Sequence, residues 1–157
     1  MKTETQERAG VDTFEIAREI EIAAPIDIAF GALLDELGPE SQMRDGKSQS
    51  MTMKLEPWPG GRWYRDLGNN SGHLWGHVQV IKPPTLVEIC GPLMMSYPAT
   101  NHVQYRLKAE GTVTRLTFLH RAMGTILPDH RDGMPQGWTQ WLEHIRVRAE
   151  GNAKGKR

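Results

Sequence analysis

A stripe of large apolar side chains near the C-terminus is the sequence feature that most constrains the fold of this chain. Its members recur at the spacing of one helical face, and they are Met134, Trp138, Trp141, Leu142, Ile145 and Ala149. Polar residues occupy the opposite face: Gln140, Glu143, Arg146 and Glu150. A face that carries two indoles must be buried, so we predict a long amphipathic helix that follows a loop from Pro128 to Gly133.

Alternation of apolar and polar residues predicts strands through most of the remaining chain. The first strand spans Phe14 to Ile22, where isoleucines alternate with acidic residues. A short helix begins near Pro25 and stops at Gly38-Pro39. Residues 40–46 are either one further helical turn or a loop. Six more strands are predicted near residues 51–55, 62–67, 73–81, 86–90, 101–109 and 113–122.

The order strand, helix, six strands, long helix predicts an α+β fold. Because short turns join consecutive strands, we expect a curved antiparallel sheet of about seven strands wrapped on the C-terminal helix. A chain of 157 residues fits a single domain. We assign residues 13–150 to this domain, residues 1–12 to a flexible N-terminal segment and residues 151–157 to a flexible basic tail.

Charge and composition exclude several classes of function. Acidic and basic residues balance at 19 each, which disfavours binding to nucleic acid. The single cysteine, Cys90, cannot form an internal disulfide and is typical of a buried, inert thiol in a reducing compartment. No apolar run is long enough for a membrane span, and the polar stretch from Met1 to Asp12 does not resemble a signal peptide. We therefore expect a cytoplasmic protein.

Several short segments resemble a known family in their order and spacing. They are Ile22–Pro25, Pro59–Trp63, Pro83–Val87, Thr114–His120, Gly137-Trp138 and Trp141-Leu142. Together they run from about Phe14 to Arg148 and resemble the bacterial family related to the C-terminal domain of the activator of the ninety-kilodalton heat-shock chaperone ATPase. This resemblance implies the helix-grip fold of the START-like (SRPBCC, birch-pollen-allergen-like) superfamily. That superfamily includes lipid carriers, plant hormone binders, polyketide cyclases and chaperone cofactors.

Two segments depart from the family pattern. Met43-Arg44 and Glu88–Gly91 stand where members of the family often carry aromatic residues. Both changes would alter the lining of any internal cavity.

A strongly bent sheet and a straight helix cannot meet along their whole length, so the gap between them is filled either by side chains or by a ligand. The candidate cavity-lining residues are Trp63, Trp75, Tyr105, Phe118, His120, Trp138, Trp141 and Leu142. These aromatic residues, with Met51, Met53, Met94 and Met95, are also large enough to close much of the gap as ordinary core.

His120 is the interior residue best suited to chemistry near neutral pH. It falls in register with Leu116 and Phe118, so it is either a hydrogen-bonded core histidine, which we favour, or an acid/base group beside a ligand. In the second case His120 and Tyr105 should face Trp138 or Trp141 across open space.

The other polar candidates have simpler explanations. His73 and His77 would lie about 13 Å apart on a strand, too far for a shared metal. His130 lies in the predicted loop before the last helix, where we expect it to be part of a solvated turn and helix cap. The pairs Arg62/Arg65 and Arg106/Arg115 are exposed charges by default, although one of them could hold a ligand carboxylate. We expect no metal or organic cofactor.

Three classes of function stay open. The first, which we favour, is a binding protein for an apolar or lipid-like small molecule, held between sheet and C-terminal helix. The second is a cyclase- or hydrolase-like enzyme that uses the same cavity with His120 and Tyr105. The third is a chaperone-linked interaction module, which follows from the family resemblance alone. A homodimer is compatible with all three.

Overall fold

A single seven-stranded antiparallel sheet and two helices make up the computed structural model, which describes residues 1–6 and 10–155. The elements are β1 (Asp12–Ile22), α1 (Ile26–Leu37), β2 (Met53–Leu55), β3 (Arg62–Gly68), β4 (Ser71–Lys82), β5 (Leu86–Gly91), β6 (Ala99–Glu110), β7 (Val113–Gly124) and α2 (Pro128–Gly155). The strands follow the order β1-β7-β6-β5-β4-β3-β2. The α+β fold predicted from the sequence is therefore confirmed.

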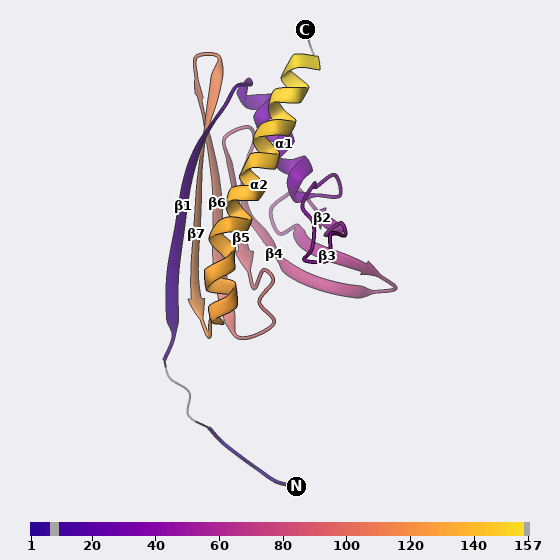
Figure 1. The fold of residues 1–157 in the computed structure, drawn as a ribbon, viewed down its shortest axis with the longest axis vertical. Helices are drawn as coiled ribbons and strands as arrows, with labels where there is room; N and C mark the ends of the chain where they lie inside the picture. The colour runs from indigo at the N-terminus through magenta and orange to yellow at the C-terminus, as the bar shows by residue number, and fades with distance from the viewer. Residues whose placement is uncertain (7–9, 156–157) are drawn as a thin grey trace.

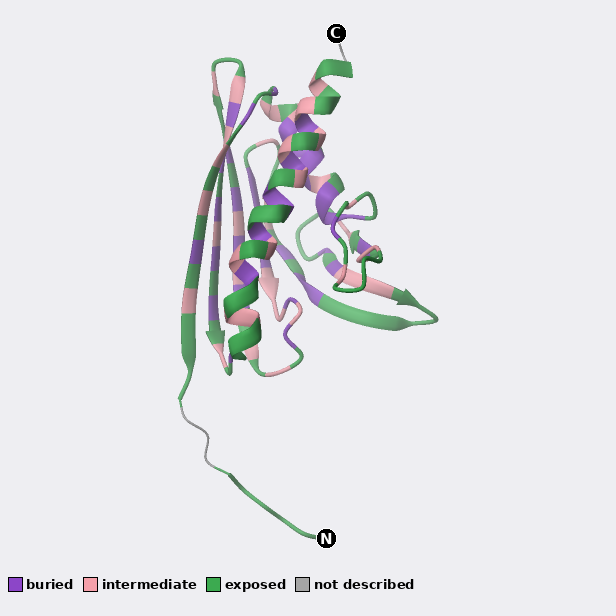
Figure 2. Ribbon diagram, viewed as in Figure 1, coloured by how far each residue is buried: buried purple, intermediate pink, exposed green. Residues whose placement is uncertain are grey.

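Both helices lie on the same side of the sheet. Figure 1 shows α2 running diagonally across it, with α1 packed beside the C-terminal part of α2 and the β3–β4 hairpin curving away. Buried residues gather on the sheet under α2 and on the face of α2 turned toward it, whereas the tip of the β3–β4 hairpin is exposed (Figure 2). The core is thus the layer between α2 and the concave face of the sheet.

The predicted stripe of α2 is buried along its whole length: Met134, Trp138, Trp141, Leu142, Ile145 and Ala149. The helix itself is longer than the sequence suggested. It begins at Pro128 rather than after Gly133, because proline is well tolerated in a first helical turn. It continues through Gly151 to Gly155, and residues 156–157 of the predicted tail, like residues 7–9, lie outside the described part of the chain.

The structure also shows the conformation of the loop after α1 and of the turn before β3. Residues 40–46 form a loop, not a further turn of α1. In the turn before β3, Gly60 has a φ of +83°, and a Cβ on Gly61 would lie 2.0 Å from the Glu56 carbonyl oxygen. Both glycines are therefore required by backbone geometry. Within the described ranges, no helix combines the length and apolarity needed to cross a membrane.

Two indole groups bind the C-terminal end of α1. The Trp141 Nε1 donates to the Glu36 carbonyl at 2.7 Å, and the Trp63 Nε1 donates to the Leu37 carbonyl at 2.7 Å. The last carbonyls of a helix have no partner within the helix, and a buried indole N–H also needs an acceptor. The two requirements are met together at this junction, which joins α1 to both α2 and β3.

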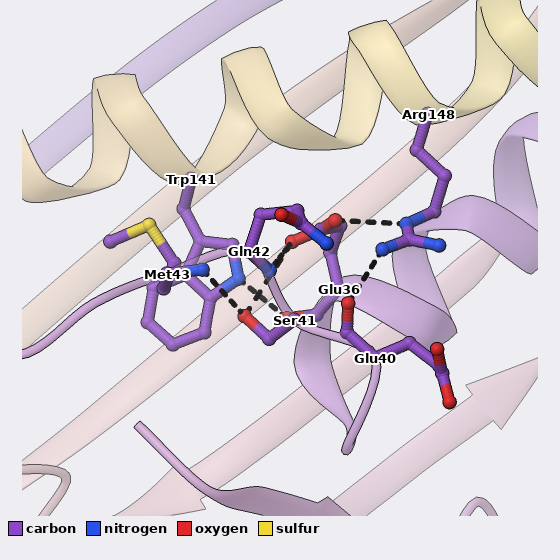
Figure 3. A network of polar contacts seen from close by, with 7 residues as sticks. All are labelled: Glu36, Glu40, Ser41, Gln42, Met43, Trp141 and Arg148. Carbon is purple, nitrogen blue, oxygen red and sulfur yellow. Dashed lines mark hydrogen bonds and ion pairs between the residues drawn. The ribbon is translucent and has the colours of Figure 1, made fainter. Parts of the chain in front are cut away.

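The Glu36 side chain strengthens the same junction (Figure 3). Its carboxylate is fully buried, and it accepts hydrogen bonds from Arg148 Nε of α2 at 2.8 Å and from the Gln42 backbone N–H at 2.9 Å. Arg148 also donates to the Glu40 carbonyl. The loop that follows α1 is thereby held against α2, and this loop carries Met43.

We expect Arg148→Ala to lower the free energy of unfolding by about 3 kcal/mol, because it leaves the Glu36 carboxylate buried without its cation. Arg146→Ala on the same helix is the matched control. Its partners, Glu143 and Glu150, are more exposed, so the loss should stay below about 1 kcal/mol. Urea denaturation of both variants measures the difference, and equal losses would show that the buried pair does not hold the junction.

Candidate functional site

A cavity of about 210 Å³ lies beside the N-terminal half of α2. Three tryptophans, four methionines, two glycines and two polar residues line it: Met43, Met51, Trp75, Met94, Asp129, His130, Gly133, Met134, Gly137, Trp138 and Trp141. They come from α2, from β4 and from the loops that follow α1 and β5. The wall is almost wholly apolar, as is usual for sites that bind small molecules.

Indole rings form the deep part of the cavity wall. Trp138 and Trp141 stack with their ring centroids 5.6 Å apart, and Trp75 meets Trp141 edge-on at 6.1 Å. All three side chains are buried. Their packing against one another fixes flat aromatic surfaces in place.

Two glycines keep the α2 side of the cavity free of side chains. Gly133 and Gly137 lie one helical turn apart, and a Cβ added to either would have no atom within 4 Å. Close packing therefore does not require glycine at these positions. The space that a side chain would take contributes to the cavity instead.

The structure divides the predicted lining residues into two groups. Trp75, Trp138 and Trp141 line the cavity. The others are buried in the core and do not line it: Trp63, Tyr105, Phe118, His120 and Leu142. The ring centroids of Phe118 and Trp138 lie 4.8 Å apart, and those of Trp63 and Trp75 lie 5.1 Å apart. Phe118 and Trp63 therefore support the indoles that form the wall.

His120 takes part in a continuous chain of buried hydrogen bonds. The Trp138 Nε1 donates to His120 Nδ1 at 2.9 Å, so Nδ1 carries no proton, and Nε2 is left to donate to the Asn101 Oδ1 at 2.7 Å. The Asn101 amide donates in turn to the Gly91 carbonyl. Burial lowers the pKa of His120 from 6.5 to about 4. The ring is thus held neutral in one tautomer.

Tyr105 does not face the cavity together with His120. The two residues stand on the neighbouring strands β6 and β7, as expected, but His120 bonds Trp138 directly instead of facing it across open space. Tyr105 packs on Phe118, and its buried hydroxyl has no hydrogen-bond partner among the described residues. Burial raises its pKa. Neither side chain lines the cavity, so the arrangement supports the core-histidine interpretation.

The cavity mouth contains two polar residues, one of which, His130, was expected in a solvated loop. His130 belongs to the first turns of α2, not to a solvated loop, because the helix begins at Pro128. Its ring stacks on that of Tyr97 with the ring centroids 5.5 Å apart, and its Nδ1 lies 2.7 Å from the Tyr97 hydroxyl oxygen. Asp129, which is exposed, lies beside it at the mouth.

Sequence analysis did not assign several lining residues to a site, namely Met43, Asp129, His130, Gly133, Met134 and Gly137. A signal for two of them was available. A glycine inside a helix costs about 1 kcal/mol relative to alanine, so Gly133 and Gly137, four residues apart, are compatible with a face kept free of side chains, although Gly151 and Gly155 share this spacing away from the cavity. For a metal, the described residues offer no group of three or more histidine, cysteine or carboxylate side chains at workable positions.

The His120 ring should stay neutral down to about pH 4 in the folded protein. The unfolded chain takes up this proton near pH 6.5, so lowering the pH from 7 to 5 favours unfolding, by about 2 kcal/mol from this group alone. Carboxylates also titrate at low pH, so the ring is best observed directly, by NMR titration of its carbon-bound protons. A midpoint near 6.5 would refute the assignment.

Comparison with known proteins gives a family match over most of the chain. A family model described as activator of Hsp90 ATPase homolog 1-like protein matches residues 24–150. A search of curated proteins gave no match.

Solved structures with the same fold include three bacterial proteins. An uncharacterized protein from Rhizobium leguminosarum has 17% identity and a TM-score of 0.67, with 90% of this chain and 97% of that chain covered. An AHSA1-like protein from Rhizobium etli has 24% identity and a TM-score of 0.61, with coverage of 89% and 84%. CalU16 from Micromonospora echinospora has 19% identity and a TM-score of 0.58, with coverage of 90% and 87%.

At these identities the structural likeness establishes the fold alone. The family match extends from the start of the first helix to the later turns of α2, and it agrees with the resemblance carried by the short sequence segments. The chain therefore belongs to the activator of Hsp90 ATPase homolog 1-like family.

Proposed function

We propose that this protein binds a compact apolar small molecule in the cavity beside α2. The observation that carries the proposal is the combination of a nearly apolar wall with a volume of about 210 Å³. An apolar cavity of about 150 Å³ is large enough for benzene, so this one suits a ligand of one or two fused rings. A long-chain lipid would require more space.

The composition of the wall supports binding of more than one shape of ligand. Met43, Met51 and Met94 lie on loops, and Met134 lies on α2. Methionine is unbranched and polarizable, so its side chain adapts to an irregular partner and makes favourable contacts with aromatic rings. The rigid indoles and the adaptable methionines together suit a flat, apolar guest.

Catalysis by the residues first considered for it finds less support. The hydrogen-bond donor and acceptor of His120 are both used within the core, and Tyr105 is buried and does not line the cavity. General acid/base catalysis needs a group within hydrogen-bond reach of the substrate. A binding role therefore fits the geometry better than a cyclase or hydrolase role that depends on these two residues.

Gly137→Leu tests the proposal, because it adds bulk to the cavity wall at a position with room for a Cβ. Naphthalen-2-ylmethanol, a neutral two-ring probe, should bind the parent protein at one site per chain in isothermal titration calorimetry. We expect Gly137→Leu to weaken this binding by about tenfold or more while stability is kept or raised, since leucine favours a helix over glycine.

Gly151→Leu is the matched control. Gly151 also lies on α2 with open space around it, but it does not line the cavity, so probe affinity should equal that of the parent. Absence of probe binding by the parent, or equal binding by Gly137→Leu, would overturn the proposed function.

A further inference from the structure

Among the described residues, the cavity is lined by one acidic side chain and by neither lysine nor arginine. Its polar lining consists of Asp129 and His130. The arginines considered as holders of a ligand carboxylate are engaged elsewhere: Arg62 pairs with Glu56, Arg65 with Asp45 and Arg115 with Glu110. The remaining one, Arg106, points into solvent on β6.

The Asp129 carboxylate is available to a ligand. It is exposed, and it forms no ion pair with any residue of the described ranges. Arg131, the nearest cation along the helix, is bound to Asp12 at 3.0 Å. A negative charge therefore stands at the mouth without a cation of the described chain beside it.

His130 is engaged with Tyr97 at the cavity mouth. Its Nδ1 lies 2.7 Å from the Tyr97 hydroxyl, which also accepts a hydrogen bond from the Leu127 backbone N–H. Asp129 is therefore the polar group at the mouth that is left without a partner of this kind among the described residues.

The N-terminus of α2 could by itself attract an anion, because a helix dipole places about half a positive charge there. Asp129 and Asp132 lie in the first two turns of this helix, and their two negative charges exceed that partial charge. The faces of Trp75, Trp138 and Trp141 add negative electrostatic potential, which attracts cations.

From these observations we infer that the ligand is a flat ring compound whose head group at the mouth is neutral or cationic, and that carboxylate amphiphiles are disfavoured. This inference rests on the proposed function. It assigns to Asp129 the role of a specificity determinant, since its charge lies where the head group of a ring seated on the indoles would emerge.

Three probes with the same ring system test the inference. They are naphthalen-2-ylmethylamine, which is cationic, naphthalen-2-ylmethanol, which is neutral, and naphthalen-2-ylacetate, which is anionic. Isothermal titration calorimetry at low salt should give affinities in the order amine, alcohol, carboxylate, with the amine about tenfold tighter than the carboxylate. High salt should reduce this ratio, because Asp129 is exposed.

Asp129→Asn locates the source of the preference. The amine-to-alcohol affinity ratio should fall several-fold in this variant, leaving the smaller preference that the indole faces contribute. Asp132→Asn removes an equal charge from the same helix at a position that does not line the cavity, so it should lower the ratio much less than Asp129→Asn does.

The titrations separate a failure of the proposed function from a failure of the charge preference. If none of the three probes binds, the proposed function is wrong. If the alcohol binds but the carboxylate binds as tightly as the amine, or if Asp129→Asn leaves the ratio unaltered, the cavity binds ligands but the assigned charge selectivity is wrong.

Discussion

The buried end of α1 determines how α2 crosses the sheet. Indole N–H groups of Trp141 and Trp63 satisfy the helix-end carbonyls, and the Glu36 carboxylate binds Arg148, about two turns further along α2. Each of these polar groups would be costly to bury alone, and each has a hydrogen-bond partner among the described residues of the junction. This arrangement also fixes the loop after α1, which places Met43 at the cavity.

A second attachment ties the middle of α2 to the sheet, and the cavity lies beyond it. Trp138 donates to His120 on β7, which anchors the helix to the strand next to the edge strand β1. Toward its N-terminus, Gly133 and Gly137 present no side chains on the cavity side, and the methionines around them border the space without filling it. The sheet and α1 therefore hold α2 firmly at its middle and along its C-terminal half. Side chains fill the space beside its N-terminal half incompletely, and this space is the cavity.

The sequence predicted the parts of this structure that are encoded locally. The alternation from Phe14 to Ile22 and the stripe of α2 each repeat with the period of a single element, so strands, helices and their order followed from them. The cavity depends on residues that different loops bring together, and no local period marks Met43 or Met94 as neighbours. His130 was misplaced because a segment with proline and glycine resembles a loop, although proline is acceptable at the start of a helix.

The central claim is that the space beside α2 receives a ring compound against the indoles of Trp138 and Trp141. A crystal of the protein soaked with a brominated naphthalene derivative tests it most directly. The anomalous signal of bromine marks the position of the ligand without any need to interpret the shape of its electron density. The account predicts one bromine site within the cavity, in contact with these indoles and the surrounding methionines, and little change in the backbone. Bromine found only at other surfaces, or a cavity closed by its own side chains in the crystal, would contradict it.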